Sequence, residues 1–167
     1  GCNFDSQDQY AAVCTSNFSS DIVLIGDSHA ASLAASLSTA FSSTLKPFEW
    51  HTNAGCPPLI DFYVSNTQSD QCSKINKGIH TKLDSSDAVE WVILSAQWSL
   101  YSSGKGFDNS LGGHETGAMN YYYQDISNNR RASQQREEEV VNGYIEYVSQ
   151  LLGVGKKVIV IDQLPVA

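Results

Sequence analysis

The chain has 167 residues, a formal net charge of −8 and 41% hydrophobic residues, which suits one globular domain with a real core. The acidic balance disfavours nucleic acids and anionic membrane surfaces as partners, because both attract basic proteins. The sequence has no apolar run of the roughly 18 residues that a membrane-spanning helix needs.

The first 20 residues are polar and have no periodic pattern, so we expect an N-terminal lead pinned by a disulfide. Four cysteines can form two disulfides in three different ways. We predict the combination that closes two short loops, Cys2–Cys14 with Cys56–Cys72. The alternative is four free thiols in a cytosolic protein, whereas paired cysteines indicate the periplasm or the cell exterior. The Cys-x-x-Cys spacing of a zinc or redox site is absent, and we expect neither a metal nor a cofactor.

Residues 21–41 predict a buried strand, a sharp turn and a helix. Residues 22–25 form an uncharged apolar run, typical of a parallel strand buried on both faces, and an Ala- and Leu-rich segment with helical spacing follows. Ser28 stands at the turn, where open α/β folds place their ligands and where helix N–H groups favour negative charge. Two interpretations are open: a helix N-cap worth about 1 kcal/mol, or a nucleophile.

The run Gly26-Asp27-Ser28-His29 resembles block I of the SGNH (GDSL-type) hydrolases. With His after the Ser, it resembles the extracytoplasmic SGNH domains attached to bacterial membrane acyltransferases that O-acetylate surface polysaccharides. The resemblance covers essentially the whole chain, although block I is its one specific motif. It implies that Ser28 is the nucleophile, and that the fold is a three-layer α/β/α sandwich with a mostly parallel, flavodoxin-like sheet.

The next segments predict a second strand, a loop and a helix. Residues 47–53 alternate large and polar side chains, as a less buried strand does. The strand ends in turn formers that include Gly55, by default a turn glycine. SGNH enzymes place a glycine after their second strand, so the resemblance implies that the Gly55 N–H donates to the oxyanion, together with the Ser28 N–H. We expect a loop over residues 59–70 and a helix over residues 72–83.

Residues 88–96 predict a central strand that leads into Gln97 and Trp98. The wider SGNH group ends this strand in Gly-x-Asn-Asp, whose Asn binds the oxyanion, but here the aligned residues 95–98 read Ser-Ala-Gln-Trp. The acyltransferase-linked relatives tend to lose the Asn and keep a Trp. We expect the Gln97 amide to donate from a longer arm. Trp98 either packs in the core or lines a sugar site, and His29 is a second candidate for lining the substrate site.

Residues 101–133 lack a regular period and predict a long loop, in which three consecutive tyrosines at 121–123 either stack on sugars or pin the loop to the domain. Residues 133–152 are the clearest helix, with Ser133 as its cap and one apolar stripe. Residues 157–162 predict a fourth buried strand.

The SGNH fold has five parallel strands, and its last part supplies an Asp-x-x-His block with the catalytic base. That block is absent from the sequence, whose four histidines are His29, His51, His80 and His114. Because a neutral serine hydroxyl is a poor nucleophile without a base, we expect residues 1–167 alone to be nearly inactive. We expect one SGNH-like domain, truncated or cleaved, that continues past Ala167 in the native protein, with the remainder a second chain or a disordered or deleted segment.

The resemblance implies serine-dependent acyl transfer, most simply of acetyl, from an acyl donor to a cell-surface glycan through an acyl-enzyme on Ser28. It also implies a membrane acyltransferase module in the same polypeptide, with the domain outside the cytoplasm and attached to the inner membrane. One alternative is a carbohydrate O-acetylesterase, which shares the acyl-enzyme. The other is a non-catalytic glycan-binding module on a degenerate SGNH scaffold, which the missing Asn and His favour.

Overall fold

The structure is a computed structural model of the chain. It describes residues 2–4, 18–44, 46–64, 71–103, 121–123 and 133–162. Of residues 2–4, 63–64, 121–123 and 133–136, the backbone alone is described.

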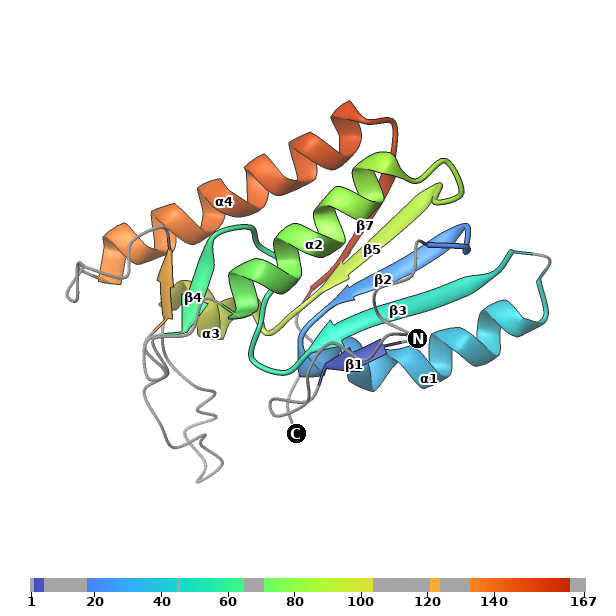
Figure 1. The fold of residues 1–167 in the computed structure, drawn as a ribbon. Helices are drawn as coiled ribbons and strands as arrows, with labels where there is room; N and C mark the ends of the chain where they lie inside the picture. Colours follow the sequence, from blue (N-terminus) through green and yellow to red (C-terminus); the bar gives the residue numbers. More distant parts are fainter. Residues whose placement is uncertain are drawn as a thin grey trace, which may run out of the picture.

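The described residues include a five-stranded parallel sheet with the order β1-β3-β2-β5-β7 (Figure 1). Its strands are β1 (Cys2–Phe4), β2 (Ile22–Gly26), β3 (Phe48–Asn53), β5 (Trp91–Ser95) and β7 (Lys157–Ile161). Strand β2 is buried throughout and β5 nearly so, as expected for uncharged central strands with covered faces. The four predicted parallel strands are therefore confirmed.

Strand β1 was not predicted, because residues 1–20 were expected to form a lead without regular structure. It extends the sheet beyond β3, with Cys2 opposite His51 and Phe4 opposite Asn53. Three residues are too few to show a period of two in the sequence, so only pairing with a distant strand reveals this element.

Helices cover both faces of the sheet (Figure 1). Helix α1 (Ser28–Ser42) lies on one face, and α2 (Gln71–Ser85) and α4 (Ser133–Gly153) lie on the other. Since successive strand residues point to opposite faces, each face has its own apolar cluster. The α1 face buries Ile22, Leu24, Ala30, Ala34 and Ile93, and the other buries Val23, Ile25, Ile75, Ile79, Leu83, Val92, Leu94, Tyr147 and Leu151. The predicted three-layer α/β/α sandwich is confirmed.

Two short elements correct the predicted loops. Strand β4 (Phe62–Val64) pairs antiparallel with β6 (Tyr121–Tyr123), so both loop predictions contain a strand. Helix α3 (Trp98–Ser103) follows β5 and includes Tyr101, which was expected to begin the long loop. A six-residue helix and a pairing across about 60 residues leave almost no local periodicity, which is why the sequence pattern did not show them.

One predicted disulfide is present. Cys56, in the loop after β3, is bonded to Cys72 at the start of α2. The other predicted pair, Cys2–Cys14, falls outside the described residues, because Cys14 is not described. In the described ranges, no helix combines the length and apolarity that crossing a bilayer requires.

Large apolar side chains are exposed around the β7 edge of the sheet. They lie on α4, on β7 and in the turn between them: Val141, Ile145, Leu152, Val154, Ile159 and Val160. Strand β7 is at an edge of the sheet, and most of its residues are not buried. The prediction of a strand over residues 157–162 is thus right in type but wrong in burial, because no described element covers its outer side.

Candidate functional site

The register of the sheet brings the predicted site residues to one edge. Gly26, the last residue of β2, lies opposite both Thr52 on β3 and Ser95 on β5. Because parallel strands end at the same edge, the loops that follow them meet there. The segments directly after these strand ends carry Ser28, Gly55 and Gln97, the residues expected to act as nucleophile and oxyanion donors.

Gly26 lets the turn after β2 pack directly against β5. A Cβ atom on this residue would lie 1.8 Å from the Ser95 carbonyl oxygen and 2.7 Å from the Ala30 Cβ atom. Both are far closer than atoms can approach, so only glycine fits here. The glycine of block I is thus required by the contact of two strand ends.

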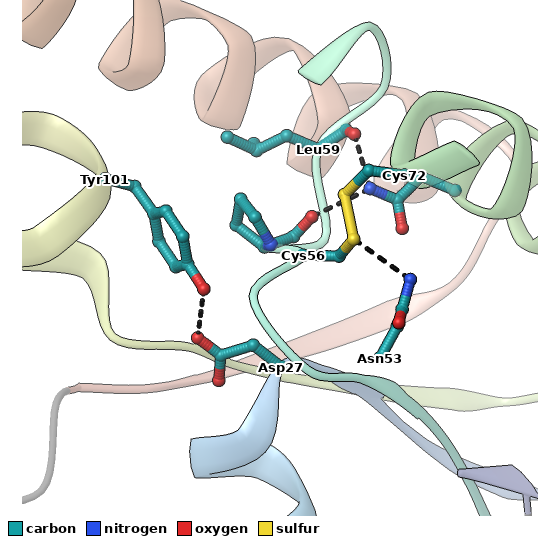
Figure 2. Close-up of a disulfide and its surroundings, with 8 residues drawn as sticks. Asp27, Asn53, Cys56, Leu59, Cys72 and Tyr101 are labelled. Atoms are coloured by element: carbon teal, nitrogen blue, oxygen red, sulfur yellow. Dashed lines mark hydrogen bonds between the residues drawn. A yellow bond between two sulfur atoms is a disulfide. The ribbon is translucent and has the colours of Figure 1, made fainter. Parts of the chain in front are cut away.

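Asp27 is the buried centre of the edge, with 1% of its surface exposed. Its Oδ1 accepts from the His29 N–H at 2.8 Å, which caps α1. Its Oδ2 accepts from the Gln97 N–H at 3.0 Å. The same oxygen accepts from the Tyr101 hydroxyl at 2.6 Å (Figure 2). These donors compensate the carboxylate for its lost hydration. Asp27 therefore joins the β2–α1 turn, the end of β5 and helix α3.

Sequence reasoning assigned no site role to Asp27 or Tyr101. The Asp27 position was visible as a common N-cap residue before a helix. Its bonds to Gln97 and Tyr101 cross 70 and 74 residues of sequence. Only the folded sheet brings these residues together, so Tyr101 had no signal in the sequence that could have identified it.

Ser28 is the first residue of α1, and its side chain is exposed. Asp27 takes the capping role, and among the described residues the Ser28 hydroxyl forms no hydrogen bond. The N-cap interpretation of Ser28 is therefore wrong. N–H groups in the first turn of a helix lack acceptors within the helix and favour a nearby negative charge. The hydroxyl thus lies where an oxyanion would be stabilised.

Gly55 occupies a turn that follows β3. The Cys56 N–H donates to the Asn53 carbonyl oxygen at 3.0 Å, and Gly55 has a φ of +72°. Glycine adopts this left-handed conformation without the steric penalty of other residues. A Cβ atom on Gly55 would meet nothing within 4 Å, so this peptide borders open space.

Four bonds hold the loop that carries Gly55. The Cys56–Cys72 disulfide ties it to α2, and the Asn53 Nδ2 donates to the Cys56 Sγ at 2.9 Å (Figure 2). The buried Asn76 side chain of α2 donates to the carbonyl oxygens of Pro57 and Leu59, at 2.8 and 2.7 Å. The loop is thus held by hydrogen bonds to its main-chain carbonyl oxygens as well as by the disulfide.

Gln97 and Trp98 follow β5 at the same edge. Gln97 is 7% exposed and its N–H is bonded to Asp27, so the predicted donor role would fall to its side-chain amide. Trp98 is half-buried, packs edge-on against Tyr144 at 4.8 Å between ring centroids, and donates from Nε1 to the Ile161 carbonyl oxygen at 3.2 Å. Burial raises the pKa of Tyr144 to about 12, so its phenol is neutral.

Trp98 also borders a hollow of about 270 Å³ beside the ends of β5 and β7. The hollow is lined by Trp98, Ser102, Val140, Val141, Tyr144, Val160 and Asp162. The contact of the Trp98 ring with Tyr144 supports the interpretation that Trp98 packs in the core. The hollow gives the substrate-lining interpretation a location, which stays a prediction.

The described histidines do not include a base for Ser28. His29 is half-buried next to Ser28, and its main-chain N–H donates to the Asp27 side chain. His51 is 3% exposed with its ring 4.8 Å from the Phe18 ring, and His80 packs 5.3 Å from the ring of Tyr147. His51 is therefore a core position, His80 is half-buried at the edge of the core, and His114 lies outside the described residues. Among the residues described, the Ser28 hydroxyl has no imidazole partner.

Comparison with known proteins adds two findings. A family model described as an SGNH domain fused to AT3 domains matches residues 1–167. The periplasmic domain of a lipopolysaccharide acetyltransferase from Salmonella ser. Paratyphi A is structurally similar, with a TM-score of 0.53 and 16% identity. The match covers 91% of this chain and 48% of that one, so the chain spans about half of that structure. At this identity the similarity concerns the fold alone. No curated protein matches the chain.

Proposed function

Because the chain belongs to the family of SGNH domains that are fused to AT3 domains, we propose that it transfers an acyl group, most simply acetyl, to a cell-surface glycan. The observation that carries this proposal is the placement of Ser28. Its side chain is exposed at the start of α1, on the edge where the strands end. Asp27 is the N-cap of this helix, so the Ser28 side chain is not needed for capping. A hydroxyl so placed has amide hydrogens beside it and space before it.

In the proposed reaction, the Ser28 oxygen attacks the carbonyl carbon of an acyl donor and its proton passes to a base. The negative charge moves to the carbonyl oxygen, which the N–H groups of Ser28 and Gly55 and the Gln97 side chain would bind. Departure of the donor's leaving group, which takes up the proton, gives an acyl-enzyme. A glycan hydroxyl then attacks the acyl carbon, loses its proton to the base and releases the Ser28 hydroxyl.

We assign the base to a further part of the same polypeptide that packs on the exposed apolar side of α4 and β7. An edge strand with exposed Ile159 and Val160, at 42% and 47%, is a template for another strand. In the full-length protein, an Ile159→Cys side chain should be protected from a maleimide reagent. A Ser36→Cys side chain on the exposed face of α1 should react fully. Equal labelling at both positions would contradict this assignment.

We also place the domain outside the cytoplasm, beside a membrane acyltransferase module of the same polypeptide. The fusion to AT3 domains supports the module, which would supply the acyl group. The Cys56–Cys72 disulfide supports an oxidising compartment, because such bonds are rare in the cytosol. The structural neighbour, itself a periplasmic domain, agrees with that location.

Ser28→Ala in the full-length protein tests the proposed function. Acetylation of the surface glycan, measured by mass spectrometry, should fall by about 10³-fold or more, because the nucleophile is lost. Ser36→Ala removes the same atom from an exposed site on α1 and should leave acetylation unchanged. Full acetylation in Ser28→Ala would refute the serine mechanism. Release of acetate from an acetylated glycan by the unmodified protein would favour the esterase alternative. Glycan binding without activity in either form would favour the binding module.

A further inference from the structure

We propose that Tyr101 is a positioning residue for this reaction, which acts through Asp27 to hold the Ser28 turn in place. The inference rests on the proposed function of Ser28. It goes beyond that function because Tyr101 comes from α3, outside the motif that carries the nucleophile.

The contact between Tyr101 and Asp27 is short and dry. Each residue is 1% exposed, and the Tyr101 hydroxyl lies 2.6 Å from the Asp27 Oδ2 (Figure 2). A hydrogen bond from a hydroxyl to a buried carboxyl oxygen at this distance is among the stronger ones in proteins, because the interior screens it less than water does. Asp27 also accepts from the main-chain N–H groups of His29 and Gln97. Tyr101 supplies its one described side-chain donor, so a substitution at residue 101 can remove this donor and leave the two main-chain donors of Asp27 in place.

Tyr101 is itself held by the loop that carries Gly55. Its ring packs edge-on against Phe62, with 5.4 Å between centroids and an interplanar angle of 84°. Both rings belong to an apolar cluster that includes Cys56 and Leu59, which follow Gly55 in the chain. The ring of Tyr101 therefore contacts the cluster beneath one predicted oxyanion donor, and its hydroxyl contacts the carboxylate beside Ser28. Tyr101 therefore contacts both parts of the predicted oxyanion site, the turn before Ser28 and the loop that carries Gly55.

Loss of the hydroxyl should affect placement more than folding. Asp27 would keep both main-chain donors, so the cap of α1 and the link to β5 would remain. The carboxylate would lose the contact that fixes it relative to the Gly55 loop. A misplacement of about 1 Å at a reacting centre can lower the rate about 100-fold, without a matching change in substrate binding. The expected signature is a lower kcat at an unchanged KM.

The experiment measures nitrophenolate release from 4-nitrophenyl acetate by the full-length protein. Tyr101→Phe should lower kcat by about 10- to 100-fold and leave KM within about twofold. Tyr147→Phe is the matched control, because it removes the same atom from a tyrosine that is 2% exposed in the cluster beneath α2 and α4. Its kcat should not change. A Tyr101→Phe kcat within twofold of the unmodified protein, an equal loss in Tyr147→Phe, or a rise in KM alone would overturn the inference.

A double-mutant cycle shows whether Tyr101 acts through Asp27. In an Asp27→Ala background, adding Tyr101→Phe should lower kcat by less than about twofold, because the side chain that accepts from the Tyr101 hydroxyl is already gone. Fully multiplicative losses would overturn the route through Asp27. Where Asp27→Ala does not fold, the Tyr101→Phe and Tyr147→Phe comparison decides. Ser28→Ala keeps the two claims apart: activity retained in Ser28→Ala refutes the proposed function, whereas activity lost there and kept in Tyr101→Phe refutes only this inference.

Discussion

Gly26 and Ser95 approach each other so closely that a single methyl group would separate β2 from β5. The two residues are register partners, and the Ser95 carbonyl oxygen would lie 1.8 Å from a Cβ on residue 26. Both strands lie inside the sheet, so neither can retreat without disturbing its other neighbour. The turn that carries Ser28 therefore depends on this contact.

Gly26→Ala should destabilise the domain by about 3 kcal/mol or more, because main-chain atoms must shift to admit the methyl group. Gly78→Ala is the matched control in α2, where the added Cβ meets nothing within 4 Å. That change should stabilise by about 0.5–1 kcal/mol, since alanine favours the helix. Urea unfolding followed by circular dichroism measures both. Equal stability of the two variants would show that the β2–β5 contact can relax.

Substitutions at Gly55 and Gly155 can distinguish a loss of stability from a loss of activity, because the two glycines have similar backbone conformations and only Gly55 lies at the candidate site. Gly55 and Gly155 have φ values of +72° and +80°, and neither has an atom within 4 Å of an added Cβ. Gly55→Ala and Gly155→Ala should each lose about 1 kcal/mol, because alanine is strained at positive φ. Gly155 lies in the α4–β7 turn, at the opposite end of the sheet. Only Gly55→Ala should also lose acetyl transfer in the full-length protein, and equal activities would remove Gly55 from the oxyanion site.

Long periodic segments explain how much of this fold the sequence predicted. The uncharged runs of β2 and β5 and the apolar stripe of α4 identified the layers, since their periods reflect burial directly. Strand β7 was predicted as buried because its residues are apolar, but burial depends on what packs outside an edge strand. No property of residues 157–162 themselves carries that information.

The candidate site was predictable only where its residues adjoin a strand end. Ser28, Gly55 and Gln97 each follow a predicted strand, so parallel topology alone brings them together. Tyr101 reaches the same edge from α3, through a hydrogen bond that spans 74 residues. Such a contact follows from the packing of α3 against the loop after β3, and local sequence carries no trace of it.

Asn76→Ala should destabilise the domain by about 2–4 kcal/mol, because it removes two buried hydrogen bonds. The Leu59 carbonyl oxygen is left without a described donor, whereas the Pro57 carbonyl oxygen keeps the Leu59 N–H. Asn76 Nδ2 donates to Pro57 and Leu59, directly after the Gly55 turn. Asn142→Ala on the exposed side of α4 should be neutral or slightly stabilising. Urea unfolding of the two variants tests this. Similar stabilities would mean that the Cys56–Cys72 disulfide alone holds the loop.

The stability of the domain should fall as the pH drops through the ordinary imidazole pKa of about 6.5, in part because of His80. Burial in α2 lowers the pKa of His80, although the nearby charge of Asp84 partly opposes this. The folded state therefore binds this proton less tightly than the unfolded state, and acid favours unfolding. Between pH 7.5 and 5.5, His80→Gln should lose less Tm than the unmodified domain, because glutamine does not titrate. Asp84→Asn should lose more, since the charge that raises the His80 pKa is gone. Thermal unfolding at the two pH values measures all three proteins, and parallel losses would show that other groups govern the acid sensitivity.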